Sequence, residues 1–364
     1  MLKKTLGIIG GGQLGSMLAQ SAKKLNIKTI IISDDRKAPA KNFADEFIFG
    51  KYTNKKIINK FLKKVDIITF EFENIPFKVL NYMNKKVKVL PKPSINKIIQ
   101  NRYLEKNFIN NLKIKTTKFK YIKSKKDLLN NLDLLPGILK TCTLGYDGKG
   151  QIVINSSNQS KKIKIDFQKE YILEKKINIK KEASVIITRF ASKKYEIYEP
   201  IENIHKNQIL KHSKIPCDIN KKIKNKAIAY AKLISEKLNY IGTLCVEYFI
   251  DKKNNLYVNE IAPRVHNSGH LTINSHNVSQ FENHIRAVCG LEQIPLKKIS
   301  NAKMINLLGD QISKYRNSPN LKENEFFFDY LKKEIKEKRK MGHLTILKWM
   351  LKSIEGNFDH PEVS

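Results

Sequence analysis

Two apolar segments joined by a short polar turn constrain the fold of this chain more than any other feature. Residues 243–250 and 256–260 have the pattern of β-strands, and residues 251–255 (DKKNN) favour a turn between them. If they form a hairpin centred on 253 and 254, Glu247 and Glu260 lie opposite each other, with Cβ atoms about 5 Å apart. Paired carboxylates favour a hard divalent cation between them. The hairpin therefore predicts a Mg²⁺ site.

A polar run follows the second strand. After Ala262-Pro263-Arg264 comes VHNSGH, residues 265–270, which has almost no apolar cover although the segments around it would bury well. Polar groups at the end of a buried strand indicate a functional site. We interpret His270, His276 and His284 as structural or surface histidines rather than metal ligands.

The N-terminal segment predicts a βαβ unit. An apolar strand over 6–9 leads into GGGQLG at 10–15, a helical pattern follows, and a second strand covers 28–33. Glycines at this spacing let backbone N–H groups approach a phosphate at a helix N-terminus, in NAD-binding and in many other folds. A later strand over 65–70 ends at Glu71-Phe72-Glu73-Asn74, which is either a ligand site or the start of a solvated loop.

A lysine and a glycine-rich loop form the next candidate site. A strand from Ile138 ends at Lys140, and the loop GYDGKGQ at 145–151 precedes another strand. The loop is not a Walker A sequence, but flexible backbone donors and ammonium groups can together enclose phosphates. The alternative is a plain hairpin loop, which needs fewer glycines than three.

Proline-rich breaks divide the chain. PKPS at 91–94 ends the first unit, and residues 295–302 resemble a linker, which predicts domains at 1–93, 94–298 and 299–364. A helix is expected from Ser94 to about Asn110. The last sixty residues alternate short strands, at 303–308 and 344–346, with a lysine-rich helical pattern.

Composition excludes several classes of protein. The net charge of +35 is spread through every segment, which argues against a nucleic-acid partner, since binders concentrate basic residues on one face. No apolar run reaches the ~18 residues that span a membrane, so we expect a cytoplasmic protein. The four cysteines are widely spaced, and we expect small buried thiols rather than disulfides or zinc ligands.

Four motifs in order resemble one family. NEIAPRVHNSGH (259–270), GYDGKGQ (145–151), GGGQLG (10–15) and RKMGH (339–343) resemble the 5-(carboxyamino)imidazole ribonucleotide synthases, which are ATP-grasp ligases of purine biosynthesis. The resemblance runs from residue 5 to about 346. It implies an α/β chain (α+β in the ATP-grasp part) with a Rossmann-like pre-ATP-grasp domain, an ATP-grasp domain with a lid at about 115–178, and a small C-terminal domain.

The resemblance also implies a reaction and its participants. Bicarbonate attacks ATP to give carboxyphosphate, and the amine of 5-aminoimidazole ribonucleotide takes up the carboxyl group, in a homodimer that uses ATP and Mg²⁺. Arg264 and His266 would be catalytic, and Glu247 and Glu260 would hold the metal. The residues assigned to ATP are Arg102, Lys140, Gly145, Tyr146, Asp147, Gly148, Lys149, Gly150, Gln151, Glu174, Lys175, Lys176, Ile177, Glu182, His205, Asn259 and Glu260. Those assigned to the ribonucleotide are Gln13, Glu73, Tyr146, Asn267, Ser268, Lys333 and Arg339.

Departures from the family pattern leave some contacts open. Ser16 replaces a residue that is often basic, and Glu337-Lys338 replaces the usual Pro-Gly, so the offset between Lys333 and Arg339 is open. A related ligase, such as formate-dependent glycinamide ribonucleotide transformylase or biotin carboxylase, would share the loop and the paired acids but not RVHNSGH. A basic NAD- or nucleic-acid-binding protein would not need the Glu247/Glu260 pair.

Overall fold

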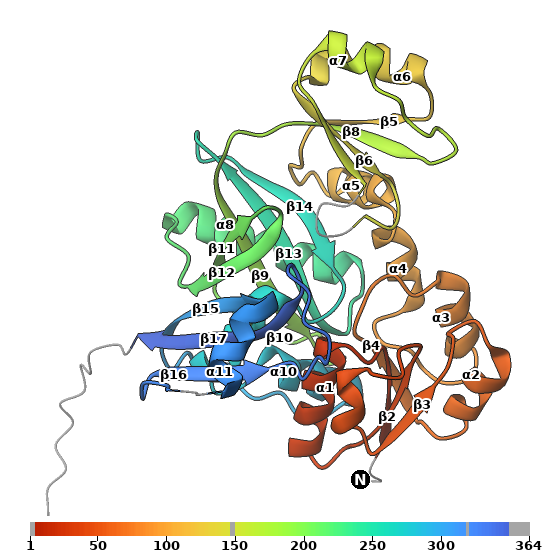
Figure 1. The fold of residues 1–364 in the computed structure, drawn as a ribbon, viewed down its shortest axis with the longest axis vertical. Coiled ribbons are helices and arrows are strands. Elements are labelled where there is room, and N and C mark those ends of the chain that lie inside the picture. Colours follow the sequence, from red (N-terminus) through yellow and green to blue (C-terminus); the bar gives the residue numbers. More distant parts are fainter. Residues whose placement is uncertain (1–3, 146–149, 318–319, 349–364) are drawn as a thin grey trace, which may run out of the picture.

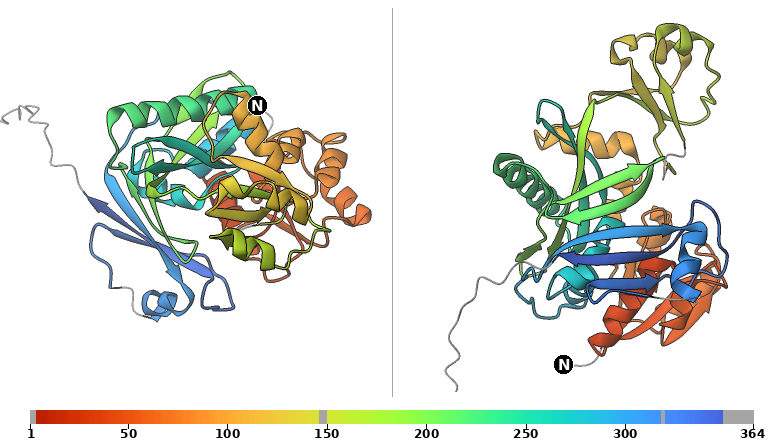
Figure 2. Two further views of the ribbon diagram at one scale, coloured as in Figure 1. Left: turned by 90° about the horizontal axis from the view of Figure 1, so that it is seen from above. Right: turned by 60° about the vertical axis from the view of Figure 1, so that its left-hand side comes forward.

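Three β-sheets organise the chain in the computed structural model, which describes residues 4–145, 150–317 and 320–348 (Figure 1). The first sheet belongs to the N-terminal part, the second projects away as a lid, and the third runs through the centre into the C-terminal strands. Figure 2 shows that the lid touches the rest only at its base. In the described part of the chain, no helix is long and apolar enough to cross a membrane.

The N-terminal sheet is parallel, in the order β3-β2-β1-β4. Its strands are β1 (Thr5–Ile9), β2 (Lys28–Ser33), β3 (Glu46–Phe49) and β4 (Ile67–Phe70), and its helices are α1 (Gln13–Lys24), η1 (Pro39–Asn42), α2 (Lys55–Leu62) and α3 (Phe77–Asn84). Because β1 and β4 are parallel neighbours, with Ile9 paired to Phe70, their carboxyl ends lie together. The glycine loop after β1 therefore meets the acidic segment after β4, at the edge where open α/β sheets bind ligands.

A break in the expected helix from Ser94 to Asn110 corrects the sequence prediction. Two helices form instead, α4 (Pro93–Ile99) and α5 (Arg102–Asn111). The side chain of Asn101 accepts hydrogen bonds from the N–H groups of Tyr103 and Leu104, so it starts a new helix as an N-cap. The break places Arg102 in the first turn of α5, beside the cleft described below.

The lid is a small antiparallel sheet in the order β5-β8-β6-β7, within the range expected for it. Its elements are β5 (Phe119–Ile122), α6 (Lys125–Leu129), η2 (Leu132–Leu134), β6 (Gly137–Thr141), β7 (Gln151–Ile154), α7 (Ser157–Lys162) and β8 (Tyr171–Lys175). It has a core of its own, which includes Leu128, Leu139 and Leu173.

The central sheet has nine strands and extends into the C-terminal part, because β15 pairs with β12. Its strands are β9 (Ile179–Arg189), β10 (Tyr195–Ile197), β11 (Ile201–Lys206), β12 (Ile209–Ile215), β13 (Gly242–Asp251), β14 (Leu256–Ala262), β15 (Asn301–Leu308), β16 (Glu325–Asp329) and β17 (Lys340–Lys348). His205 lies in β11. Between the strands expected at 303–308 and 344–346, where only a lysine-rich helical pattern was expected, residues 325–329 form a further strand, β16, which pairs with β17.

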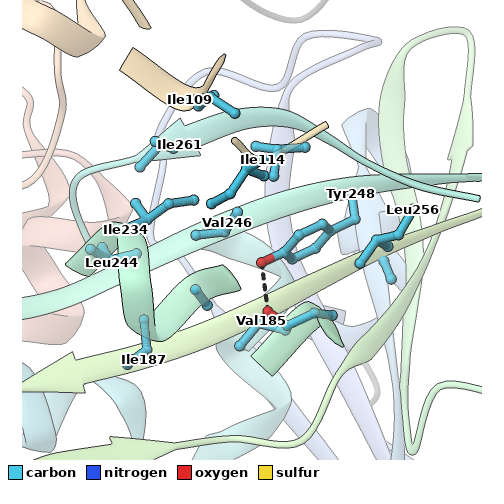
Figure 3. Close-up of a cluster of buried hydrophobic side chains, with 14 of the residues drawn as sticks. Ile109, Ile114, Val185, Ile187, Ile234, Leu244, Val246, Tyr248, Leu256 and Ile261 are labelled. Atoms are coloured by element: carbon cyan, nitrogen blue, oxygen red, sulfur yellow. Dashed lines mark hydrogen bonds between the residues drawn. The ribbon is translucent and has the colours of Figure 1, made fainter. Parts of the chain in front are cut away.

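Helices cover the central sheet and join it to the N-terminal part. The remaining elements are α8 (Lys221–Lys237), η3 (Asn267–Leu271), α9 (Thr272–Ser275), α10 (Gln280–Cys289), η4 (Gly309–Ile312) and α11 (Ser313–Asn317). Figure 3 shows Ile234 of α8 and Ile109 of α5 over one face of β9, β13 and β14, and the hydroxyl of Tyr248 donates to Ala227 O at 2.8 Å. On α10, Phe281 and Ile285 share a core with Leu18 of α1, which fixes the N-terminal part against the sheet.

Candidate active site

A cleft of about 930 Å³ lies where the three sheets meet. Residues from the glycine loop, the end of β4, α5, the lid, β11, the β13–β14 hairpin and the segment before β17 line it. Predicted site residues from all parts of the chain, from Gln13 to Arg339, are therefore brought into one space. Polar groups that converge in the main cleft make it the candidate active site.

The hairpin forms as predicted, with Glu247 paired to Glu260. Near the turn, however, the pairs are Tyr248 with Val258 and Phe249 with Tyr257, and the register shifts beyond Tyr248. Asn259 is the extra residue of a β-bulge, which turns side chains toward new directions. As a result, Asn259 and Glu260 both line the cleft.

Each acid of the pair contacts a nitrogen-bearing side chain. Glu247 Oε1 lies 2.9 Å from His266 Nε2, and Glu260 Oε2 accepts from Arg102 Nη1 at 3.1 Å. Burial raises the pKa of Glu247, but His266 outweighs this effect and lowers it to about 2. Two carboxylates on paired strands, with 15% and 41% of their side chains exposed, supply the oxygen donors that suit Mg²⁺.

A buried ionic cluster lies at the base of the lid. Glu174 Oε2 accepts from Lys140 Nζ at 3.0 Å, and Glu174 Oε1 lies 3.3 Å from Lys106 Nζ. Burial opposes the charge of Glu174, but the two ammonium groups lower its pKa to about 2. Glu174 and Lys140 were predicted site residues, whereas Lys106 was missed. Its signal was weak, since one lysine in a lysine-rich chain does not stand out.

Helix α5 contacts β14, the edge strand of the central sheet that carries Glu260. Besides the pair of Arg102 with Glu260, Glu105 Oε1 accepts from Ile261 N at 2.6 Å, and Lys106 Nζ donates to Asn259 O at 3.4 Å. Three side chains of α5 thus contact three consecutive residues of β14. Burial, and then the charge of Glu260, raises the pKa of Glu105 to about 8. Glu105 is a second residue that the sequence did not reveal.

Most residues predicted to contact the nucleotide line the cleft. On its lid and β11 walls these are Gly145, Gln151, Glu174, Lys175, Lys176, Ile177, Glu182 and His205. His205 Nδ1 lies 2.7 Å from Glu182 Oε2. Burial lowers the pKa of His205, but the hydrogen bond and charge of Glu182 raise it further. Gly150 does not line the cleft and has a φ of +73°, which favours glycine. Tyr146, Asp147, Gly148 and Lys149 lie outside the described residues.

The two predicted residues Arg264 and Glu73 form an ion pair. The Nη2 of Arg264 donates to Glu73 Oε1 at 3.2 Å, and its Nε donates to Oε2. Burial alone would raise the pKa of Glu73, but the Arg264 guanidinium holds it below its usual value. Two hydrogen bonds from a planar guanidinium to one carboxylate fix the orientation of both groups.

Glu71 occupies the glycine loop. Its carboxylate accepts hydrogen bonds from the N–H groups of Gly12 and Gly15, and a Cβ at Gly10 would lie 2.4 Å from its Cγ. The backbone donors that would bind a dinucleotide phosphate are therefore used by a side chain of the protein itself. Burial raises the pKa of Glu71. This arrangement argues against NAD.

One of the two C-terminal residues predicted to contact the ribonucleotide lies one position away from the residue that lines the cleft. Lys332 lines the cleft and its Nζ donates to Gln13 Oε1 at 2.7 Å, whereas Lys333 is exposed and outside the lining. Because Glu337-Lys338 replaces the usual Pro-Gly, the sequence did not predict the path of the loop before β17. In the structure, the start of β17 at Lys340 sets the direction of that loop. Arg339 lines the cleft, as does Asn267, but Ser268 is fully buried behind it.

Other polar candidates are structural. His270, His276 and His284 are all buried, so the surface alternative was wrong for them, and burial lowers their pKa values. The four cysteines are buried and free, as predicted. Ligand atoms of Cys245, Glu247 and His266 lie within 4.8 Å of one another, but burial raises the pKa of the Cys245 thiol and opposes a thiolate ligand.

The lid, the paired acids and Lys140 in the cleft between them fit an ATP-grasp enzyme. The family model of the ATP-grasp domain matches residues 107–281. That of the ribonucleotide synthetase preATP-grasp domain matches 3–100, and that of the phosphoribosylaminoimidazole carboxylase C-terminal domain matches 302–355. The predicted fold class is therefore confirmed.

Relatives then specify the family. N5-carboxyaminoimidazole ribonucleotide synthases of Bacillus subtilis (strain 168) and Staphylococcus aureus (strain MRSA252) are 38% and 40% identical, over 94% of this chain and 91% and 92% of theirs. The S. aureus synthetase complexed with ADP has a TM-score of 0.88 and 37% identity, covering 95% of this chain and 93% of that one. The Aspergillus clavatus synthase with ADP and 5-aminoimidazole ribonucleotide has a TM-score of 0.87 and 26% identity, covering 95% and 94%.

The chain belongs to the N5-carboxyaminoimidazole ribonucleotide synthase family. The predictions of an ATP-grasp carbon–nitrogen ligase and of an ATP-dependent carboxylation in purine biosynthesis are thereby confirmed. The relatives named above are not transformylases, so the alternative prediction gains no support.

Proposed function

We propose that this cleft joins bicarbonate to 5-aminoimidazole ribonucleotide at the expense of ATP, through carboxyphosphate. The proposal rests mainly on the path of β14 and the turn after it. Strand β14 lines the part of the cleft proposed for ATP, and the turn lines the part proposed for the ribonucleotide. Glu260 pairs with Arg102, which also donates to Gly145 O of the lid, and four residues later Arg264 meets Glu73 from the N-terminal sheet. A phosphoryl donor and an amine acceptor can therefore share one space.

The first step forms carboxyphosphate. A bicarbonate oxygen attacks the γ-phosphorus of ATP, the bond to the bridging oxygen breaks, and ADP leaves. Lys140 and the backbone donors of the loop at 145–151 would hold the phosphates, while Glu182 and His205 would contact the nucleoside. Mg²⁺ held by Glu247 and Glu260 would neutralise the β- and γ-phosphates. Arg264 would stabilise the negative charge on the bicarbonate side, because its guanidinium is fixed in place before the reaction.

The second step transfers the carboxyl group. The exocyclic amine of the ribonucleotide attacks the carboxyl carbon, phosphate leaves, and the amine loses a proton. Gln13, Glu73 and Arg339 would hold the ribonucleotide. Lys332 would take the role first assigned to Lys333, since Lys332 lines the cleft beside Gln13.

The cellular setting follows from the family resemblance. We infer a cytoplasmic homodimer, in line with a biosynthetic enzyme of this family. Light scattering coupled to gel filtration at micromolar concentration tests the dimer, which should elute at twice the 42.1 kDa of the chain. A mass of one chain at every concentration would refute it.

Phosphate release tests the reaction. Purified protein with ATP, Mg²⁺ and bicarbonate should release inorganic phosphate only after 5-aminoimidazole ribonucleotide is added, and label from ¹³C-bicarbonate should enter the product. Glycinamide ribonucleotide with formate serves as the matched control and should give no release. A folded preparation without substrate-stimulated release would contradict the proposal.

A further inference from the structure

A chain of buried hydroxyl and amide groups lies behind His266. Ser213 Oγ donates to Asn203 Oδ1 at 2.9 Å, and Asn203 Nδ2 donates to Ser184 Oγ at 2.9 Å. Ser184 Oγ lies 2.8 Å from Ser268 Oγ, which lies 2.8 Å from His266 Nδ1. This series of hydrogen bonds runs from β12 through β11 and β9 to the turn that carries His266. Three of its four members before the histidine are fully buried, and Asn203 is 5% exposed.

Groups that can only donate determine which member of each hydrogen bond in this series is the donor. The backbone N–H of Ser268 points to His266 Nδ1 at 3.3 Å, so Nδ1 must offer a lone pair. Because Nδ1 accepts, the hydroxyl of Ser268 must donate its proton to Nδ1, and Ser268 Oγ in turn accepts from Ser184 Oγ. In the neutral imidazole the hydrogen must therefore be on Nε2, the nitrogen that faces Glu247.

The rest of His266 is held just as firmly. The side-chain amide of Gln280 pairs with both polar groups of its backbone: Oε1 accepts from His266 N at 2.9 Å and Nε2 donates to His266 O at 2.6 Å. A Cβ at Gly269 would lie 2.6 Å from Gln280 Oε1, which explains a glycine at that position. Backbone and ring are thus fixed by separate contacts.

We propose that Ser268, supported by Ser184 and Asn203, is a positioning residue that orients His266 and keeps its proton on Nε2. This rests on the proposed function of the cleft and on the catalytic role that the family resemblance implies for His266. It replaces the predicted contact of Ser268 with the ribonucleotide, because Ser268 is fully buried and absent from the cleft lining. The Nε2–H group is thereby directed at Glu247, one of the two carboxylates proposed to hold Mg²⁺.

Histidine-selective ¹⁵N NMR of the full chain reads the tautomer without reference to activity. The His266 ring, assigned by its loss in His266→Gln, should show a protonated Nε2 and an unprotonated Nδ1. In Ser268→Ala and Ser184→Ala the ring signals should shift or broaden toward mixed tautomers. Ser235→Ala is the matched control: its hydroxyl is fully buried in α8 without a hydrogen-bond partner, so its removal should change neither the spectrum nor turnover.

Kinetics separate positioning from substrate binding. Ser268→Ala should lower kcat about ten- to a hundred-fold, as loss of a supporting hydrogen bond does at other sites, with the KM values for ATP and ribonucleotide within about twofold. Ser184→Ala should lower kcat less. A raised KM for the ribonucleotide with an unchanged spectrum would return Ser268 to substrate binding, and an Nδ1–H in the wild type would overturn the proposal. Full activity of His266→Gln would instead refute the role proposed for His266.

Discussion

Replacing Glu105 with glutamine should make the protein more resistant to alkaline pH. The carboxyl group of Glu105 is buried against β14, and burial with the charge of Glu260 raises its pKa from 4.5 to about 8. A group whose pKa is higher in the folded state stabilises the fold fully below 4.5, and this stabilisation is lost as the pH rises toward 8. Glutamine keeps an acceptor for Ile261 N–H but cannot ionise.

The size of the effect follows from the two pKa values. One pKa unit corresponds to about 1.4 kcal/mol, so the stabilisation lost between pH 4.5 and 9 is about 5 kcal/mol at most. For 364 residues the unfolding entropy near 60 °C is about 0.8 kcal/mol/K, which converts this into about 6 °C in Tm. We expect Glu105→Gln to exceed the Tm of the wild type by about 2 °C at pH 5.5, one unit above the unfolded pKa, and by up to about 6 °C at pH 9.

Thermal unfolding followed by circular dichroism at pH 5.5, 7, 8 and 9 measures the difference. Glu292→Gln removes an exposed carboxylate instead, and its Tm should follow the wild type at every pH. Parallel curves for Glu105→Gln and the wild type would refute the reasoning, since they would mean that Glu105 does not change its protonation on folding.

Three further perturbations test the cleft. Lys106→Met removes one of two ammonium groups at Glu174 and should lower the free energy of unfolding by about 3 kcal/mol in urea titrations; no change would mean that Lys106 is uncharged in the fold. Arg264→Lys loses the fork on Glu73 and should lower kcat about 10²–10³-fold while the KM for ATP stays nearly constant. If kcat and the affinity for ATP fell equally, Arg264 would be assigned to nucleotide binding instead. Chelation of Mg²⁺ should abolish phosphate release, and Glu247→Gln should raise the Mg²⁺ concentration for half-maximal activity at least about tenfold; an unchanged Mg²⁺ dependence would remove Glu247 from the metal site.

Local patterns determined the hairpin that carries the metal pair. Strand alternation and the DKKNN turn were enough to place Glu247 opposite Glu260, although the pairing is reached through a bulge at Asn259 that the pattern did not predict. The βαβ start and the buried free cysteines were equally predictable. In each case the decisive interactions lie within a few residues or depend on side-chain polarity alone.

The glycine loop shows where local patterns fail. GGGQLG fits a phosphate site, but which acceptor fills it depends on β4 lying beside β1, and only this pairing brings Glu71 to Gly12 and Gly15. The same holds for Lys106, which looks like any other lysine until α5 and the base of the lid enclose it.

The sequence by itself determined which elements form and which motifs they carry, because turns, periodicity and caps act over short distances. The tertiary structure decided which side chains face the cleft and which support them from behind. Lys332 rather than Lys333 points inward because β17 sets the path of the loop before it. Ser268 lies behind His266 because β9 and β11 bring Ser184 and Asn203 to it. Such contacts join residues far apart in the chain, and their pairing is fixed by packing.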